Sequence, residues 1–274
     1  MKLTKAPIHS LFRKIAMGSW RTAGDPSVYG LLEMDVSNAK KFLIDKQKNC
    51  QYPLTLTHFV GKVLANVMKD RPEINGMIRR GHIYNRDSVD IFYQVNIPGK
   101  DGDSVSKATL SGVTLRKVED LSLEQIAEQL GTRAAHIKKG GVGELTKSTD
   151  NMAIVPVPLV KWVLNLISFL NYDIGLNMSW AGVPRDPFGS VMITNVGGMG
   201  IDCAWAPLVP YTRVPLLLTL GEIRERPWVL DGQVVVRPVM RLGITFDHRF
   251  MDGVHAAEMS RHFQKCFNQP ELYI

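Results

Sequence analysis

The segment Met240-Arg241-Leu242-Gly243-Ile244-Thr245-Phe246-Asp247-His248-Arg249-Phe250-Met251-Asp252-Gly253 decides how the C-terminal part of the chain is folded. Its first seven residues alternate between large apolar side chains and polar or small ones, which predicts a strand with one buried face. From Val254 onward, apolar residues recur at helical spacing, so a helix follows. His248 therefore stands at the end of a buried strand, and Asp252-Gly253 forms the turn into the helix.

The same reasoning places the other elements. Strands are expected at 28–36, 82–85, 88–97, 190–194, 215–221, 228–230, 233–236 and 239–246, and helices at 37–48, 56–69, 122–138 and from 254. Ser37 and Ser122 are expected N-caps, the residues 85–87 are expected to join two strands into a hairpin, and Asp231-Gly232 predicts a tight turn. Strands and helices mix without strict βαβ alternation, which predicts an α+β fold with a mixed or antiparallel sheet.

Composition sets broad limits on the class of protein. A chain of 274 residues that is 45% hydrophobic can bury one large core, so we expect a single domain over residues 1–274. The net charge of +7 is spread along the chain, which fits an ordinary basic enzyme, and it suits coenzyme A as well as nucleic acid. The three cysteines are isolated, which indicates neither a zinc site nor a disulfide framework and favours a reducing compartment.

Two segments need separate interpretation. The first 24 residues are basic and contain no acid, as in a transit peptide, but we interpret them as part of the mature protein. Residues 152–170 are strongly apolar, yet they contain two prolines, Lys161 and Asn165, and fall short of the ~20 apolar residues of a spanning helix. A buried or interface helix is favoured over one that lies on a membrane surface.

A histidine at the end of a strand beside a helix start is well placed for proton transfer. An unperturbed imidazole has a pKa of about 6.5 and a thiol about 8.5, so a neutral histidine can accept a thiol proton as the sulfur attacks a carbonyl. The simpler alternatives are a structural imidazole at His248 and a helix N-cap at Asp252, and position alone leaves both open. His248, His255 and His262 lack the further ligands of a metal site.

Other common motifs give no support to rival functions. Gly197-Gly198-Met199-Gly200 follows a predicted strand but does not match the dinucleotide-binding pattern, so a tight turn is expected there. The chain also lacks the phosphate-binding loop, the serine-hydrolase elbow and the zinc-protease motif.

The motif Asp247-His248-Arg249-x-x-Asp252-Gly253 resembles the active-site signature of the catalytic domains of dihydrolipoyl acyltransferases from 2-oxoacid dehydrogenase complexes, which are relatives of chloramphenicol acetyltransferase. Further segments resemble the family in family order, namely Arg13-Lys14-Ile15-Ala16, Pro72-Glu73-Ile74-Asn75, Val89-Asp90-Ile91, residues 121–127, residues 193–197 and residues 235–240. The resemblance covers most of the chain. It implies a chloramphenicol acetyltransferase-like two-layer sandwich with a mixed sheet, assembled as a trimer.

The resemblance also implies roles for individual residues. His248 would deprotonate the attacking thiol, with its ring held by its own backbone carbonyl. Thr194 takes the place of a hydroxyl residue, usually serine, that stabilises the tetrahedral oxyanion. Asp252 would complete the catalytic set as structural support by pairing with an N-terminal arginine, for which Arg13 is the candidate, and Gly253 would support the turn.

In such trimers the site lies between subunits, with coenzyme A entering from one side and lipoamide from the other. Asn195 and Gly197 are expected to contact coenzyme A, and residues 270–274 resemble the tail that joins trimers into larger cores. The expected partners are a lipoyl-bearing protein or other 2-oxoacid dehydrogenase components, with no nucleic acid, no membrane contact, no metal and no lipoyl lysine in this chain. The expected location is the cytoplasm, or the mitochondrial matrix in a eukaryote.

Three departures from the family pattern bear on the substrate. The chain begins directly at the catalytic domain, without lipoyl or peripheral-subunit-binding domains. Pro26-Ser27-Val28-Tyr29 replaces the usual Pro-His-Phe, and residues 98–105 replace an apolar channel run. An insertion at about 151–186 has no family counterpart.

The predicted function is therefore acyl exchange between coenzyme A and a thiol acceptor of the dihydrolipoamide type. Two alternatives remain open from the sequence. One is a non-catalytic oligomeric scaffold of a 2-oxoacid dehydrogenase-like complex, and the other is acyl transfer to a small-molecule hydroxyl.

Overall fold

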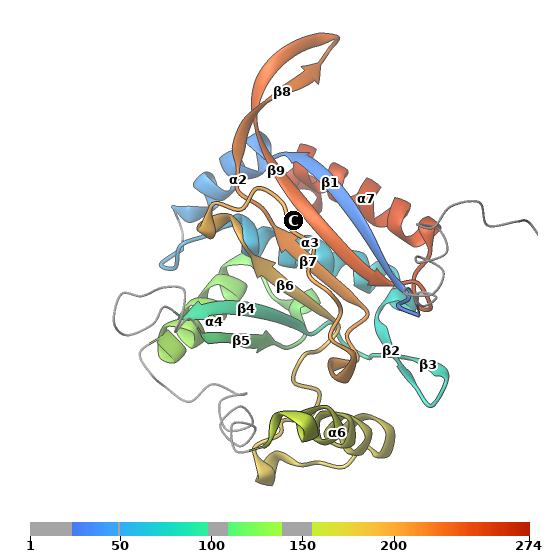
Figure 1. The fold of residues 1–274 in the computed structure, drawn as a ribbon. Helices are drawn as coiled ribbons and strands as arrows, with labels where there is room; N and C mark the ends of the chain where they lie inside the picture. The colour runs from blue at the N-terminus through green and yellow to red at the C-terminus, as the bar shows by residue number, and fades with distance from the viewer. Residues whose placement is uncertain (1–23, 49, 98–108, 139–154) are drawn as a thin grey trace, which may run out of the picture.

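A computed structural model describes residues 24–48, 50–97, 109–138 and 155–274 (Figure 1). Within these residues, seven strands form a mixed sheet in the order β1-β9-β7-β6-β4-β5, and β8 pairs with the outer part of β9. These strands are β1 (Ser27–Asp35), β4 (Ile91–Ile97), β5 (Thr109–Leu115), β6 (Val191–Asn195), β7 (Leu216–Leu220), β8 (Arg224–Leu230) and β9 (Gln233–Asp247). The mixed sheet of an α+β protein is confirmed.

Helices cover one face of this sheet. They are α2 (Ser37–Gln47), α3 (Leu56–Asp70), α4 (Leu123–Lys138), α7 (Gly253–Asn268) and the short α8 (Pro270–Tyr273). The buried faces of β1, β7 and β9 meet the apolar faces of α3 and α7 in one continuous core, where Phe59, Phe263 and Phe267 are almost fully enclosed. This face is the two-layer part of the sandwich (Figure 1).

The register of the sheet defines two ends. β4, β6 and β7 are parallel to one another and β9 is antiparallel to β7, with Val191 beside Ile91 and Leu216 opposite Phe246. The starts of β4, β6 and β7 therefore lie at the same end of the sheet as the end of β9, where Asp247 lies opposite Ser27. The ends of β6 and β7 lie at the other end of the sheet.

The expected hairpin between residues 82 and 97 is wrong. β3 (His82–Asn85) pairs instead with β2 (Gly76–Arg79) in a separate two-stranded sheet. Arg80 and Gly81 both have positive φ, 48° and 76°, which is the geometry of the tight two-residue turn that suits adjacent strands. The Asn75 side chain then donates to the Ser88 carbonyl at 3.0 Å, which redirects the chain into the main sheet.

Two other expectations also change. The strands predicted at 233–236 and 239–246 are one strand, β9, because Arg237 and Pro238 continue the pairing with β8, and Val239 pairs with both β8 and β1. Ser37 is the first helical residue of α2 rather than its N-cap, since the Asp35 carboxylate accepts its backbone N–H at 2.9 Å.

The other turn and cap predictions tested here are confirmed. Gln125 donates its backbone N–H to the Ser122 hydroxyl at 3.2 Å, which caps α4. Asp231 and Gly232 have φ of 50° and 78° in the hairpin turn between β8 and β9. The segment from Gly197 to Gly200 is a single helical turn, closed by Gly200 in the left-handed region.

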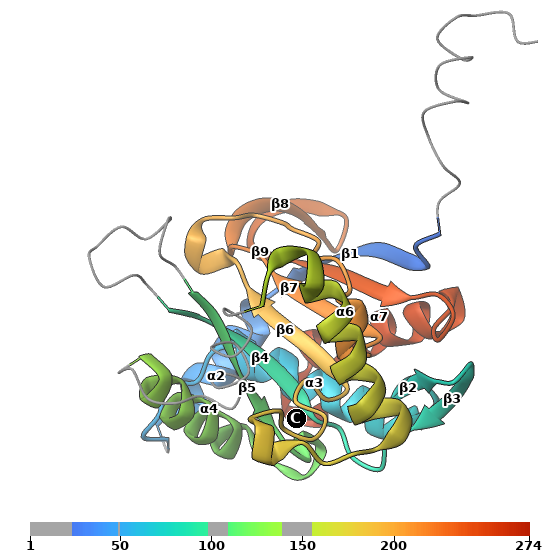
Figure 2. The same ribbon diagram turned by 60° about the horizontal axis from the view of Figure 1, so that its bottom comes forward.

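Residues 155–186, the described part of the segment predicted as an insertion, contain α6 (Val157–Ser168), a π-helical turn, η3 (Phe169–Ile174), and a short turn, η4 (Ser179–Ala181), and this segment keeps the name insertion. Figure 2 shows α6 in front of the sheet, on the side away from α2 and α3. The interface interpretation stays open, but the helix is not buried, because the Trp162 side chain is 74% exposed. None of the described helices has the length and apolarity needed to cross a membrane.

One carboxylate fastens the insertion to the body of the protein. Asp173 is buried, and its side chain accepts hydrogen bonds from Arg213 Nη2 at 2.7 Å and from the Arg80 backbone N–H at 3.2 Å. Its carbonyl accepts two more from the Arg79 guanidinium at 2.6 and 3.1 Å. Buried, charge-assisted bonds thus hold the insertion, in addition to the buried side chains of Tyr172 and Met178.

Replacing Asp173 should loosen the insertion. We expect Asp173→Ala to cost about 2 kcal/mol in the free energy of unfolding and to make residues around α6 sensitive to limited proteolysis, because Arg213 loses its buried partner. Asp45→Ala, which removes a carboxylate from an exposed pair with Lys48, is the control and should change neither measurement by much. Equal effects of the two substitutions would contradict this account of the anchor.

Candidate active site

His248 lies where the sequence predicts it, directly after β9. Its backbone N–H donates to the Pro26 carbonyl at 2.9 Å, and the backbone N–H of Asp247 donates to the Pro215 carbonyl at 2.9 Å. The residues just before both neighbouring strands therefore hold this end of β9. The imidazole is exposed and lies 6.5 Å from the Phe246 ring, nearly parallel to it. No hydrogen bond joins the ring to another described residue, and its contact with its own carbonyl stays a prediction.

The two residues that flank His248 clamp the turn. Asp247 is buried, and its carboxylate accepts from Arg249 Nη2 at 2.7 Å, from Nε at 3.0 Å and from the backbone N–H at 3.0 Å. The hydrogen bond that Arg249 donates to the Asp247 side chain raises the pKa of Arg249. The Asp247 carbonyl also accepts from Phe250 and Met251. The Asp-His-Arg pattern therefore has a local structural cause that the sequence reasoning missed.

Asp252 is the N-cap of α7. Its carboxylate accepts the backbone N–H of Val254 at 2.9 Å and that of His255 at 3.2 Å, and His255 Nδ1 in return accepts the Asp252 N–H at 3.2 Å. These backbone bonds, that of His255 first, lower the pKa of Asp252. Its expected partner Arg13 lies outside the described residues. A Cβ at Gly253 would meet nothing within 4 Å, so packing does not require glycine there.

Thr194 is half-buried near the end of β6, and the next residue, Asn195, lines a pocket of about 530 Å³ that Thr194 itself does not line. Asn195 donates to the Thr57 hydroxyl at 3.0 Å, and its side-chain oxygen accepts the Gly197 N–H at 3.0 Å. A Cβ at Gly197 would lie 2.7 Å from the Gly221 carbonyl, so this position requires glycine. The pocket is lined by Lys40, Leu43, Ile44, Gln47, residues 54–57, Asn195, Gly197, Gly198, residues 221–223 and Met240.

One chain does not bring His248 and Thr194 together. Thr194 lies beside Thr219 of β7, which lies opposite Gly243 of β9. His248 is five residues further along β9, and at about 3.3 Å a residue it stands roughly 16 Å away along the strand direction. The structure thus places Thr194, Asn195 and Gly197 at one end of the sheet and His248 with Asp252 at the other.

Comparisons with known proteins agree with the fold and with the C-terminal motif. Residues 188–274 match the family model of 2-oxoacid dehydrogenases acyltransferase (catalytic domain). The dihydrolipoyllysine-residue acetyltransferase component of the pyruvate dehydrogenase complex of Bacillus subtilis is 35% identical over 85 residues, which are 31% of this chain and 19% of that protein. The corresponding component from Staphylococcus aureus (strain Mu50) is 34% identical over 82 residues, 30% of this chain and 19% of its own length.

Solved structures match nearly the whole chain. The cubic core of the pyruvate dehydrogenase multienzyme complex has a TM-score of 0.66 at 18% identity, covering 99% of this chain and 94% of that one. The dihydrolipoamide acetyltransferase of Azotobacter vinelandii has a TM-score of 0.65 at 17% identity, covering 99% and 94%. The chain shares the fold of these acyltransferase cores, and residues 188–274 match the sequence model of the acyltransferase catalytic domain of 2-oxoacid dehydrogenases. The resemblance drawn from the sequence is confirmed.

The capping role of Asp252 can be tested by its dependence on pH. Because its folded pKa lies below the ordinary value of 3.8, the ionised cap stabilises the fold fully above that value, and the stabilisation is lost as the pH falls through the lowered pKa. We expect Asp252→Ala to lower the Tm at pH 7, and Asp252→Asn to retain most of it, since the amide oxygen also accepts backbone N–H groups.

The difference in Tm between the wild type and Asp252→Ala should shrink in a thermal unfolding series as the pH falls from 3.8 through the lowered pKa of Asp252. A difference that persists unchanged at low pH would show that the carboxylate charge at Asp252 contributes nothing to the cap.

Proposed function

We propose that the protein is an acyltransferase that exchanges an acyl group between coenzyme A and a thiol acceptor of the dihydrolipoamide type. The observation that carries the proposal is the exposed imidazole of His248, fixed at the end of a buried strand inside the segment that matches the acyltransferase family. An imidazole held by its backbone and open to solvent can meet a substrate thiol. The relatives are named for acetyl transfer to a dihydrolipoyl group.

In the proposed reaction His248 is the general base. It takes the proton of the attacking thiol as the sulfur adds to the thioester carbonyl, which gives a tetrahedral oxyanion and an imidazolium. The hydroxyl of Thr194 donates a hydrogen bond to that oxyanion. When the intermediate collapses, the bond to the leaving sulfur breaks and the imidazolium returns its proton to it. The new thioester and the released thiol balance the reaction.

His248 and Thr194 would act together across a subunit interface. Their separation along the sheet, roughly 16 Å, is too large for one substrate carbonyl to contact both, so a second copy must supply one of them. We assign the assembly as a homotrimer, by analogy with the fold neighbours, one of which forms a cubic core. The pocket that Asn195 and Gly197 line would hold the pantetheine arm of coenzyme A.

The Azotobacter relative supports this choice of residues. Its catalytic mechanism was investigated at a serine, a histidine and an asparagine, and the asparagine is four residues after the histidine. In this chain the corresponding spacing joins His248 to Asp252, and Thr194 supplies a hydroxyl like that of the serine. Asp252 would act by holding the start of α7, with Gly253 at its first position. We further propose that Arg13 pairs with Asp252.

The remaining assignments follow from the family. The acyl acceptor would be carried by a lipoyl-bearing protein or by other components of a 2-oxoacid dehydrogenase complex, since the relatives are named as components of such a complex. Trimers would assemble further through the C-terminal residues, where the Leu272 side chain is 72% exposed. We propose a cytoplasmic location.

The general base can be tested by one substitution. We expect His248→Ala to reduce acyl transfer from acyl-coenzyme A to free dihydrolipoamide by roughly 10²- to 10⁴-fold, because no other group takes the thiol proton. The measurement is thiol release over a panel of acyl-coenzyme A species, with and without dihydrolipoamide. His136→Ala, at an exposed position of α4, is the control and should remain active. An active His248→Ala enzyme would refute the proposal.

The shared site can be tested by complementation. We expect Thr194→Ala to reduce transfer by roughly 10²-fold or more, since the oxyanion loses its donor. When His248→Ala and Thr194→Ala subunits are unfolded together and refolded as mixed oligomers, some sites combine an intact His248 with an intact Thr194, so part of the activity returns. A mixture that assembles but stays inactive would contradict the shared site. A wild-type oligomer that neither binds coenzyme A nor transfers acyl groups would instead favour a scaffold.

A further inference from the structure

A second cavity, of about 460 Å³, lies between the insertion and the body of the protein, and we call it the insertion pocket. Neither His248 nor Thr194 lines it. One wall comes from the β2–β3 sheet and the start of β4, and the other from the insertion around η3 and the loop before β6. Its lining residues are Met77, Arg79, residues 84–88, Asp90, Arg116, Asn171, Tyr172, Gly175, Arg185 and Asp186.

Basic side chains outnumber acidic ones around this cavity. Four guanidinium groups and three carboxylates line it. The guanidinium groups belong to Arg79, Arg86, Arg116 and Arg185, and the carboxylates to Asp87, Asp90 and Asp186. Arg116 pairs with Asp90 at 2.7 Å. Arg185 is exposed at the rim, and its side chain pairs with no residue in the described parts of the chain. The pocket therefore keeps a net positive charge and one guanidinium with free donors.

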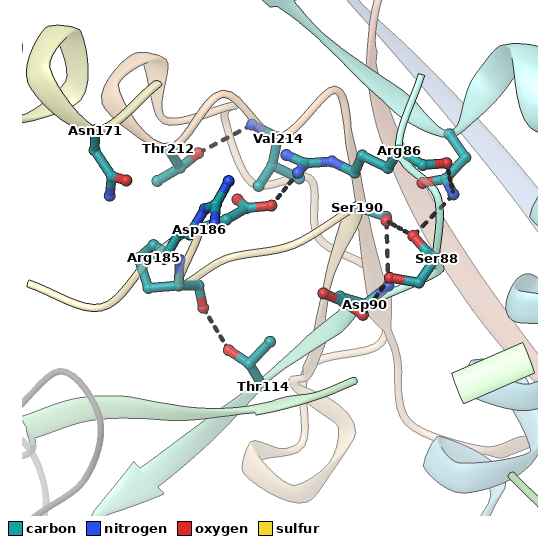
Figure 3. Close-up of polar contacts among 12 residues, drawn as sticks. Arg86, Ser88, Asp90, Thr114, Asn171, Arg185, Asp186, Ser190, Thr212 and Val214 are labelled. Atoms are coloured by element: carbon teal, nitrogen blue, oxygen red, sulfur yellow. Dashed lines mark hydrogen bonds and ion pairs between the residues drawn. The ribbon is translucent and has the colours of Figure 1, made fainter. Parts of the chain in front are cut away.

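Arg86 is the buried member of the set. Its side chain is only 8% exposed, and its Nη1 donates to the Asp186 carboxylate from the opposite wall (Figure 3). Its Nε and Nη2 are enclosed and have no hydrogen-bond partner among the described residues, and neither has Oδ1 of Asp186. Buried donors of a charged group are costly to leave unpaired, and proteins satisfy them with water or a ligand.

Hydrogen bonds connect the residues beneath the cavity, and a tyrosine in its wall stays protonated. Ser88 donates to Asp90 at 3.2 Å, and the Ser190 N–H donates to the Asp90 carbonyl at 2.7 Å, which joins the starts of β4 and β6 beneath the pocket (Figure 3). Burial, and then the Asp186 charge, raise the pKa of Tyr172, so its hydroxyl stays neutral near pH 7. A neutral phenol adds a donor rather than a negative charge.

We propose that the insertion pocket binds a small oxyanion, the phosphate or carboxylate group of a small molecule. The planar guanidinium fork matches both groups and forms short, charge-assisted hydrogen bonds with them. Arg185 and Arg116 make the outer contacts, and Arg86 supplies a positive charge behind them, where low exposure strengthens its field. The volume lies in the range of small-molecule sites.

The bound anion would join the two walls. Arg185 belongs to the insertion, whereas Arg116 follows β5 of the main sheet, so one ligand bridges them. Binding to the folded state alone raises its stability with ligand concentration. A bound anion would thus stabilise the insertion in its position against the body. This role is separate from acyl transfer, because it does not depend on His248 or on coenzyme A.

The test measures binding without an activity assay. The full chain is titrated by calorimetry with inorganic phosphate, and separately with succinate, against a chloride buffer of equal ionic strength, and the Tm is recorded over the same series. Arg185→Ala should weaken binding of the preferred anion roughly tenfold or more. Arg261→Ala is the matched control, since it removes an exposed arginine of α7 that has no partner among the described residues.

The outcomes distinguish a phosphate ligand from a carboxylate ligand, and they show whether the pocket binds an anion at all. A saturable response to phosphate alone identifies a phosphate-bearing ligand, and a response to succinate alone identifies a carboxylate. Arg86→Met should abolish either response, with its fold verified by circular dichroism. No saturable binding of either anion, or equal binding by Arg185→Ala and Arg261→Ala, overturns the proposal. Because acyl transfer is not measured, neither result depends on the proposed reaction.

Discussion

The structure depends on the pairing of β9 with β1 on one side and β7 on the other. This register buries Leu242, Ile244 and Phe246 against the helices, and it ends the strand at Asp247, whose N–H bonds to the Pro215 carbonyl. A slip of one residue would turn the buried set to the opposite face of the sheet. The position of His248 is therefore fixed by the apolar core rather than by contacts of its own ring.

The other face of the same strands explains two glycines. A Cβ at Gly243 would collide with the Ala204 carbonyl, and one at Gly221 would collide with the Asp202 carbonyl. The loop after β6 crosses the sheet at these points, so it returns the chain from the Thr194 end to the start of β7 without widening the layer. The Trp205 indole fastens this loop to the Gly30 carbonyl at 2.7 Å. The pocket end and the His248 end are thus parts of one rigid sheet.

The insertion contacts the body of the protein through buried polar groups. Several of its apolar side chains, Trp162 among them, face outward, whereas Asn171 and Asp173 are buried together with Tyr172 and Met178. Asp173 is held by Arg213 and Arg79 of the body, whereas Asn171 donates to the Pro184 carbonyl at 3.1 Å. Burying the Asp173 charge is costly without complete pairing, but the paired carboxylate has a defined position. The incomplete pairing of Arg86 in the insertion pocket belongs to this polar interface. Charged contacts of Asp173 and Asp186 with arginines of the body therefore contribute to this interface, beside the buried Tyr172 and Met178.

The sequence alone determined the C-terminal strand and the helix after it, because alternation and helical spacing in residues 240–267 are strong local signals. It also determined the Asp231-Gly232 turn, whose chemistry lies in two adjacent residues. The choice of His248 as candidate base rests on the family resemblance, and the structure decided that Asp252 caps the helix. Tertiary structure decided the partners of β3, since residues 82–97 favour a hairpin locally and only the Arg80-Gly81 turn selects β2. It alone placed Thr194 and His248 at opposite ends of the sheet, because strand register is a property of pairs of segments and no single segment encodes it.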